Sequence, residues 1–449
     1  MTGPPTLERP QPPAGSSPHD LTRWLSRPLR LALRSTFSRY KDTPLTYEVV
    51  FSDGSVYRNR AGEPALSIRF KTVGAELRTA LFTDMGLLDA YFDQTVDIHG
   101  DIAGLVKLDA QGDATLAAKN SGGPHANPLN RWRNWWHKQR HDARTAAQAK
   151  ANAEAHYDLP NEFFEIVLGS TYGYTCAYWG PDTRTLDQAQ HDKYDHICKK
   201  LALEPGCRLV EVGSGWGYLS LLAAKTYGAV VDNYGLVRSQ NDYMQRMIDA
   251  QGLGDSVHIL ERDHRELGTD GRQYDRYVSV GVYEHAQEKY LGDWIESIAR
   301  GLKEGGIGVL HFIGHQQKRE TNYFIRRHVF PGCYVPGLEE TVDLMSNHGL
   351  EVLHIENLRR HYALTLDCWA ANFASGWQKI RSLDPQRFDE GFRRRWDAYF
   401  RLCAEGFRTP NNLQRLYQIT FSKGNTPTYP MRNDFIYRAA HQRGARSEQ

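Results

Sequence analysis

The sequence has little of what would mark several specialised classes of protein. Its 55 Lys and Arg residues nearly balance 53 Asp and Glu, so no strong field of one sign favours nucleic acid or another polyanion as a partner. No apolar run reaches the roughly 18 residues that a membrane-spanning helix requires. The length of 449 residues and an apolar content of 40% instead predict a globular protein of two or three domains.

Cysteine is also scarce. The six cysteines include no C-x-x-C pair and follow no apolar signal segment, which predicts reduced thiols, no metal site and a cytoplasmic location. One of them, Cys176, stands in the aromatic segment TYGYTCAYWG at 171–180. The thiol therefore requires an explanation other than a disulfide framework.

The composition of the chain divides it into segments. Six prolines among the first 18 residues predict a disordered arm over 1–20. Alternating runs, an Asp-Gly turn and the helical pattern TVGAELRTALF predict a small α+β domain over 21–128. Helix-favouring residues then predict a linking helix over 129–155, and a tail is expected over 426–449.

The expected linking helix carries Trp132, Trp135 and Trp136 at helical spacing, interleaved with basic residues. Such a helix could lie at a membrane surface, with its indoles at the level of the lipid headgroups. The alternative is that the indoles pack on a neighbouring domain and the charges form a solvated face. The sequence leaves both interpretations open.

From Leu209 onward, apolar strands alternate with helices as far as GIGVLHFIG. This alternation predicts βαβ units and a parallel sheet, and hence a doubly wound, Rossmann-like α/β domain over 156–425.

A glycine-rich turn, VEVGSGWG at 210–217, follows the first of these strands. Its G-x-G-x-G spacing differs from the dinucleotide and P-loop patterns. In this strand-turn-helix context the glycines let a ligand approach the backbone, although an ordinary tight turn is the alternative. Glu211 resembles the acidic residue of S-adenosylmethionine-dependent methyltransferases, and Asp232 is a candidate for a ribose contact.

Six blocks of sequence resemble those of one known family and occur in the same order, which makes the resemblance specific. The blocks AHYDLPNEFFEIVLGSTYGYTCAYW, VEVGSGWG, VSVGVYEHAQEKY, VLHFIG, FPGCYVP and HYALTL resemble the cyclopropane-fatty-acyl-phospholipid synthase family, which includes the mycolic acid cyclopropane synthases. The segment MGLLDAYFDQTVDIHGDI looks like the accessory N-terminal domain of longer members. The resemblance implies methylene transfer from S-adenosylmethionine to a cis double bond of a phospholipid acyl chain. A substrate of this kind in a chain without a membrane span predicts peripheral association with the inner face of the membrane. Members of the family are often dimers, which makes a homodimer an open expectation, and the near-neutral charge predicts no nucleic-acid partner.

In the implied reaction, the alkene attacks the sulfonium methyl group, and the resulting carbocation closes to a ring after losing a proton from that methyl group. The family is understood to use a bound bicarbonate ion as the base. The resemblance carries its ligands over to the following residues: Cys176, Glu284, His311, the backbone of Ile313, and Tyr362. Cys176 would then be a neutral donor, and Tyr172, Tyr174, Tyr178 and Trp179 around it would stabilise the cation through their π faces.

The chemistry of the reaction constrains the role of Glu284 and that of a further cysteine, Cys403. Glu284 beside an anion requires a protonated carboxyl group or a shared proton. Cys403 matches a cysteine that has been treated as the family's active-site thiol, but the reaction needs no covalent enzyme intermediate, so we rank it below Cys176. Taken one at a time, Cys176, His311 and Glu284 would be interpreted as ordinary structural residues.

The implied cofactor contacts form a second set. They are Tyr174, Thr175, Glu211, Gly213, Ser214, Gly215, Val237, Asp242, Asp263 and His264. The segment up to Asp242 looks two residues longer than the family's strand-to-helix turn, and His264 stands where an aromatic residue commonly covers the adenine. The ribose and adenine contacts are therefore the least constrained part of the prediction.

Other functions remain open at this point. A relative could make a methyl-branched, methylene or furan-methylated lipid, or methylate a small amine. The fold could also serve a lipid-binding protein without catalysis. Nucleic-acid binding through the Trp-rich segment is disfavoured by the near-neutral charge.

Overall fold

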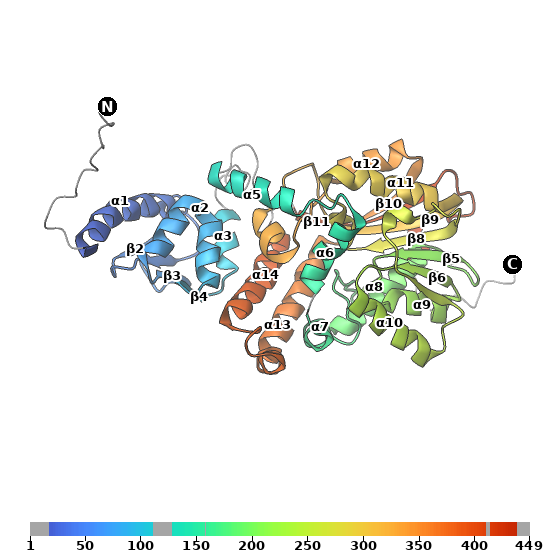
Figure 1. Cartoon of the computed structure of the whole chain (residues 1–449), viewed down its shortest axis with the longest axis horizontal. Coiled ribbons are helices and arrows are strands. Elements are labelled where there is room, and N and C mark those ends of the chain that lie inside the picture. Colours follow the sequence, from blue (N-terminus) through green and yellow to red (C-terminus); the bar gives the residue numbers. More distant parts are fainter. Residues whose placement is uncertain (1–17, 111–127, 158, 410–413, 438–449) are drawn as a thin grey trace, which may run out of the picture. The chain divides into compact units, whose positions relative to one another are not determined.

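A computed structural model of the chain describes residues 18–110, 128–157, 159–409 and 414–437 (Figure 1). Most of the arm expected over 1–20 and the last residues of the expected tail lie outside the described residues. The chain divides into two compact units, 1–101 and 102–449, whereas the sequence placed the boundary near residue 128.

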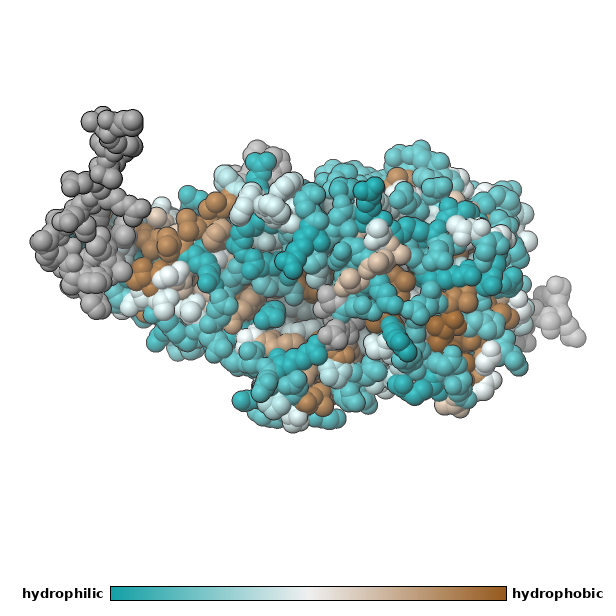
Figure 2. All heavy atoms as spheres, in the orientation of Figure 1, coloured by the Kyte–Doolittle hydropathy of each residue, from teal (hydrophilic) through white to brown (hydrophobic). Residues whose placement is uncertain are grey.

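Unit 1 is an α+β domain, as expected. It contains α1 (Pro18–Ser38), β1 (Tyr47–Val50), β2 (Val56–Arg58), β3 (Leu66–Phe70), α2 (Val73–Phe92) and β4 (Val96–Gly100). The strands form one sheet in the order β2-β1-β3-β4, in which β1 and β3 are parallel. Leu31, Leu77 and Leu81 are 41–68% exposed, and Figure 2 shows apolar surface over α1 and α2.

Local sequence explains these elements. The Asp-Gly turn joins β1 to β2 with Gly54 at φ +84°, a value that glycine adopts without strain. Thr72 caps α2 by accepting a hydrogen bond from the backbone N–H of Ala75 at 3.1 Å. Thr83, at φ 55°, kinks this helix, which extends ten residues beyond the predicted helical pattern.

Unit 2 contains the predicted doubly wound sheet. Its strands are β5 (Arg208–Val212), β6 (Val230–Tyr234), β7 (Val257–Leu260), β8 (Tyr274–Val280), β9 (Leu302–His315), β10 (Leu350–Asn357) and β11 (Gln414–Lys423). They lie in the order β10-β11-β9-β8-β5-β6-β7. The adjacent strands β9, β8, β5, β6 and β7 are parallel to one another. Strand β11 is antiparallel to both of its neighbours, β9 and β10. The sequence analysis did not anticipate β10 and β11.

Helices cover both faces of this sheet (Figure 1). On one face lie α8 (Leu186–Lys200), α9 (Tyr218–Tyr227) and α10 (Arg238–Gln251), and on the other lie α11 (Leu291–Gly301) and α12 (Leu338–Asn347). Two buried clusters fill the two layers, with Ile197 and Leu219 in one and Trp294 and Ile298 in the other. The remaining helices include α3 (Gly104–Ala110), α7 (Asn161–Leu168), α13 (Arg359–Leu383) and α14 (Glu390–Arg408).

The single helix expected over 129–155 is two helices, α5 (Pro128–Arg140) and α6 (Ala146–Tyr157). The chain breaks between them because its backbone bonds elsewhere: the carbonyl of His141 accepts from Gln287 Nε2 at 2.6 Å and from Asn152 Nδ2 at 2.9 Å. Among the described residues, no helix is both long and apolar enough to cross a membrane.

Candidate active site

The first pocket lies at the carboxyl ends of β5, β6 and β8, and we call it the glycine-turn pocket. Gly213, Gly215 and Gly217 all have positive φ values, from +55° to +84°. A Cβ on Gly213 would come within 2.3 Å of Val282, and one on Gly217 would come within 2.3 Å of Met244. A Cβ on Gly215 would meet no protein atom within 4 Å, so this glycine faces open pocket space.

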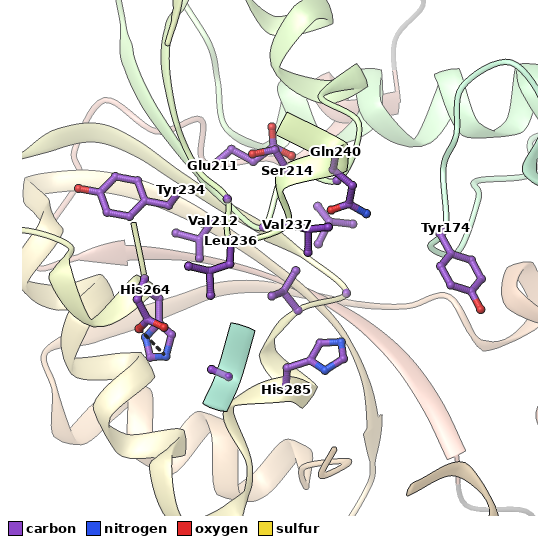
Figure 3. A pocket seen from close by; sticks show the side chains of 18 of the residues that line it. Tyr174, Glu211, Val212, Ser214, Tyr234, Leu236, Val237, Gln240, His264 and His285 are labelled. Atoms are coloured by element: carbon purple, nitrogen blue, oxygen red, sulfur yellow. Dashed lines mark ion pairs between the residues drawn. The ribbon is translucent and has the colours of Figure 1, made fainter. Parts of the chain in front are cut away.

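Polar groups line this pocket at separate places (Figure 3). Glu211 accepts a hydrogen bond from the Ser220 hydroxyl group, and burial raises the pKa of this carboxyl group to about 7. The buried hydroxyl group of Ser214 has no hydrogen-bond partner among the described residues. Figure 3 shows Tyr234 and His264 at one end and Tyr174 at the other. The pocket is thus elongated and offers polar contacts along its length.

Asp263 and His264 stand at the start of a short 3-10 helix. Burial opposes ionisation of Asp263, but hydrogen bonds from the Arg265 guanidinium group, at 2.6 and 2.9 Å, keep its pKa below the usual value. The ring centroid of His264 lies 4.0 Å from that of Trp294. Burial lowers the pKa of His264 to about 4. His264 is therefore a neutral aromatic surface, which is what a nucleobase contact needs.

Nine of the ten predicted cofactor residues line the glycine-turn pocket. They are Tyr174, Thr175, Glu211, Gly213, Ser214, Gly215, Val237, Asp263 and His264. Asp242 does not line it: its side chain is 61% exposed and lies 3.9 Å from Arg238. The turn between β6 and α10 spans only 235–237, and helical periodicity then places Gln240 in the pocket with Asp242 on the outer face.

Asp232, the suggested ribose contact, is engaged elsewhere in the structure. Its carboxylate lies 2.9 Å from His258 Nδ1 and accepts a hydrogen bond from the Tyr274 hydroxyl group, also at 2.9 Å. Asp232 does not line the pocket, whereas Tyr234, two residues further along the same strand, does.

The sequence did not predict that the loop after α5 and the helix α6 border this pocket. Ala143, Ala149 and Asn152 line the pocket. Gln287 holds this segment in place, because its Oε1 accepts from the backbone N–H of Ala143 at 2.9 Å and its Nε2 donates to His141. Gln287 has a φ of 66°, which is unusual outside glycine and consistent with a constrained functional position.

A second pocket contains all six predicted catalytic residues, and we call it the cysteine pocket. They are Cys176, Glu284, His311, Ile313, Tyr362 and Cys403. They come from the loop before α8, the 3-10 turn after β8, strand β9, and helices α13 and α14. The structure therefore brings together residues that are up to 227 positions apart, the separation from Cys176 to Cys403 (403 − 176 = 227).

Glu284 is the only carboxylic acid among the residues that line the cysteine pocket. Its Oε1 accepts a hydrogen bond from the backbone N–H of Ile313 at 2.5 Å, and its buried Oε2 has no partner in the described part of the chain. Burial raises the pKa of Glu284 to about 7, against a weaker opposing effect of the Ile313 hydrogen bond. A substantial fraction of this carboxyl group is consequently protonated near neutral pH.

Three thiols line the pocket, and the two that were predicted to be catalytic, Cys176 and Cys403, are both neutral. Burial raises the pKa of Cys176 well above the usual value and that of Cys403 to about 12. The thiol of Cys176 lies 3.3 Å from the carbonyl oxygen of Ala177, to which it can donate. Because a thiolate is the nucleophilic form, neither cysteine is set up for nucleophilic catalysis.

The aromatic surroundings differ from the expectation. Tyr178 and Trp179 do not line the cysteine pocket, and Tyr172 lines only the glycine-turn pocket. The chain leaves the pocket after Cys176, because the backbone N–H of Tyr178 donates to Ala189 of α8 at 2.9 Å. The aromatic residues that do line the cysteine pocket are Tyr174, Phe330, Tyr362, Tyr399 and Phe407.

The two pockets adjoin. Tyr174, Thr175, Gly281 and His285 line both of them. Burial lowers the pKa of His285 to about 4, so this shared boundary is uncharged at neutral pH. A group that extends from a ligand in the glycine-turn pocket can therefore reach a ligand in the cysteine pocket.

Comparisons with known proteins agree with this geometry. Residues 141–419 match the family model described as mycolic acid cyclopropane synthetase. A probable fatty acid methyltransferase of Pseudomonas putida is 34% identical over 71% of this chain and 77% of its own. The cyclopropane-fatty-acyl-phospholipid synthase of Escherichia coli is 34% identical over 60% of this chain and 67% of its own.

A solved structure shares the fold. The crystal structure of mycolic acid cyclopropane synthase CmaA1 complexed with SAH and CTAB covers 61% of this chain and 98% of that chain. Its sequence identity is 29% and the TM-score is 0.56.

The doubly wound sheet, the glycine turn and these matches define an S-adenosylmethionine-dependent methyltransferase. The chain belongs to the mycolic acid cyclopropane synthetase family.

Proposed function

We propose that the protein transfers a methylene group from S-adenosylmethionine to a cis double bond of a phospholipid acyl chain, forming a cyclopropane ring. The observation that carries the proposal is the cysteine pocket, which adjoins the cofactor pocket, has mainly apolar and aromatic walls, and contains one buried set of polar groups. An acyl chain fits such walls, and a polar methyl acceptor does not need them.

The glycine-turn pocket fits S-adenosylmethionine. The space beside Gly215 and the unpartnered hydroxyl group of Ser214 suit close approach of a polar ligand, and Glu211 suits its amino-acid end. His264 would contact the base, with Gln240 replacing Asp242 in the predicted set of contacts. When bound, S-adenosylmethionine would supply an electrophilic sulfonium methyl group.

The walls of the cysteine pocket protect and stabilise the charge that develops on the acyl chain. Phe330, Phe407 and Leu366 exclude water, which would otherwise capture a carbocation. The faces of Tyr174, Tyr362 and Tyr399 offer π density to a cation. These side chains replace the aromatic set that the sequence suggested.

The polar groups of the cysteine pocket fit a small anion. Two buried atoms, Glu284 Oε2 and His311 Nε2, have no partner among the described residues, and the Tyr362 hydroxyl group adds a further donor. Cys176 would donate to the anion only with its thiol turned away from the Ala177 carbonyl oxygen. Bicarbonate held by these groups would supply the base for the proton of the transferred methyl group. Since burial raises the pKa of Glu284 to about 7, its carboxyl group can carry a proton near neutral pH and donate it to the anion in a hydrogen bond, which removes the like-charge conflict.

We further propose that the protein binds the membrane surface from its cytoplasmic side. Trp132, Trp135 and Trp136 on α5 are 52–60% exposed, which supports the interfacial interpretation over packing within unit 2. Exposed leucines of α1 and α2 add apolar surface on unit 1.

The test is incubation of the purified protein with S-adenosylmethionine and vesicles that contain a monounsaturated phospholipid. Mass spectrometry should show acyl chains that have gained one CH2 unit and lost the double bond. A methyl-branched or methylene product would indicate another branch of the family chemistry, and no modified lipid would contradict the proposal.

A further inference from the structure

A row of polar side chains crosses three antiparallel strands behind the cysteine pocket. His311 on β9 lies opposite Gln418 on β11, and Gln418 lies opposite Glu356 on β10. Directly paired residues of neighbouring strands project from the same face of a sheet. The register of the three strands thus places these side chains in one line that ends in the pocket.

Lys200, the last residue of α8, lies over this row. Its Nζ donates to Gln418 Oε1 at 2.8 Å and to Glu356 Oε2 at 2.6 Å. Both Lys200 and Gln418 are fully buried, and His311 is 1% exposed. Glu356 also lies 2.8 Å from His196 Nε2. The result is a buried ion pair joined to an amide and then to an imidazole ring.

These contacts fix how the amide of Gln418 is oriented. A lysine ammonium group can only donate hydrogen bonds, so the Gln418 atom that faces Lys200 must be the carbonyl oxygen. The amide nitrogen then faces His311 Nδ1, at 3.0 Å, and can only donate to it.

The orientation of the amide in turn fixes the tautomer of His311. Burial holds the pKa of this histidine well below its usual value, so the ring is neutral and carries one proton. Since Nδ1 accepts from Gln418, the proton resides on Nε2. Nε2 is the buried atom that has no partner among the described residues, and His311 lines the cysteine pocket.

We propose that Lys200 and Gln418 are positioning residues that hold His311 in its Nε2–H tautomer, so that the ring presents a donor to an anion in the cysteine pocket. The opposite tautomer would direct a lone pair at the anion and repel it. The catalytic consequence rests on the proposed function, whereas the assignment of the tautomer does not.

The direct test is nitrogen NMR of the full-length protein labelled with 15N-histidine, with the His311 signals assigned by their loss in His311→Gln. In the wild type, between about pH 6 and pH 8, Nε2 should show the chemical shift of a protonated ring nitrogen and Nδ1 that of an unprotonated one. Gln418→Glu replaces the donating amide nitrogen with an accepting oxygen and should protonate Nδ1. A protonated Nδ1 in the wild type, or unchanged shifts in Gln418→Glu, would overturn the proposal.

The second test measures the bicarbonate concentration that gives half-maximal activity. Lys200→Met and Gln418→Met should raise it by about 10-fold, the effect of losing a hydrogen bond to a charged group, with unchanged affinity for S-adenosylmethionine. Lys199→Met is the matched control, since Lys199 is the preceding residue on α8 and pairs with Asp195 instead. Should Lys200→Met fail to fold, Gln418→Met still decides.

The two tests separate the inference from the proposed function. If folded Lys200→Met and Gln418→Met keep wild-type bicarbonate dependence, the positioning role is refuted. If the wild type does not depend on bicarbonate at all, the proposed base is wrong, and the nitrogen shifts alone decide whether the row fixes the tautomer.

Discussion

The backbone N–H of Ile313 donates to Glu284 Oε1 at 2.5 Å, and this one bond directs the other carboxyl oxygen of Glu284 to an environment without a partner among the described residues. The bond thereby joins strand β9 to a buried acid in the wall of the cysteine pocket. Because burial raises the pKa of Glu284 to about 7, its carboxyl group would not repel the small anion that we propose beside it.

Glu284→Gln keeps the oxygen that Ile313 contacts and removes the ionisable group. If Glu284 positions the base, the rate should fall on the order of 10²–10⁴-fold, while the dissociation constant for S-adenosylmethionine changes little. Steady-state kinetics and calorimetry measure the two quantities. Glu288→Gln is the control, because Glu288 lies four residues away and pairs with Lys318 at the surface. Full activity of Glu284→Gln in bicarbonate-free buffer would remove the anion site from the mechanism.

The free energy of unfolding of the protein should depend on pH through Glu284. The folded pKa of about 7 exceeds the usual value of 4.5, so the folded state binds this proton more tightly than the unfolded state. Raising the pH across the window from about 4.5 to about 7 should therefore lower the free energy of unfolding by up to about 3 kcal/mol through Glu284. Denaturant unfolding at the two ends of the window should show a smaller loss in Glu284→Gln than in the wild type. Equal losses would mean that Glu284 titrates normally.

Gly215→Val should prevent binding of S-adenosylmethionine. The added side chain enters open pocket space, and φ at this position is +55°, so the change combines steric exclusion with backbone strain. Gly252→Val separates the two effects, since Gly252 has a φ of +65°, also has nothing within 4 Å, and caps α10 away from the pocket. Calorimetry should show lost binding in the first variant and retained binding in the second. Retained binding in both would mean that the turn does not contact the cofactor.

Replacing Trp132, Trp135 and Trp136 together by Ala should weaken binding to anionic vesicles by roughly 1–3 kcal/mol through the loss of interfacial burial. Vesicle sedimentation measures the effect. Trp377→Ala, on α13, makes the same substitution at a partly exposed tryptophan outside α5 and should bind as the wild type does. Unchanged sedimentation of the folded triple variant would exclude α5 from the membrane contact.

The sequence was sufficient for the parallel part of the large sheet and for the six catalytic candidates that line the cysteine pocket. The strands that end at Val212 and Val280 were predictable because each is an apolar run followed by glycine. The resemblance of the sequence blocks brought Cys176, Glu284 and Tyr362 into one predicted site, and all three line the cysteine pocket. Apolar strands can be predicted from a short stretch of sequence, and the blocks are identified by their order along the chain.

What the sequence did not predict depends on register and packing. Asp242 and Gln240 exchange roles because the position at which α10 begins decides which of them faces inward. Tyr178 leaves the pocket because its backbone bonds to α8. The row from Glu356 to His311 exists only through pairing across three strands, which no periodicity within one strand reveals.

The most direct test of the central claim uses S-adenosylmethionine with a fully deuterated methyl group. Cyclopropane formation requires the transferred carbon to lose one hydrogen, so mass spectrometry of the lipid should find only two of the three deuterium atoms in the product. Retention of all three deuterium atoms, as in a methyl-branched chain, would contradict the account.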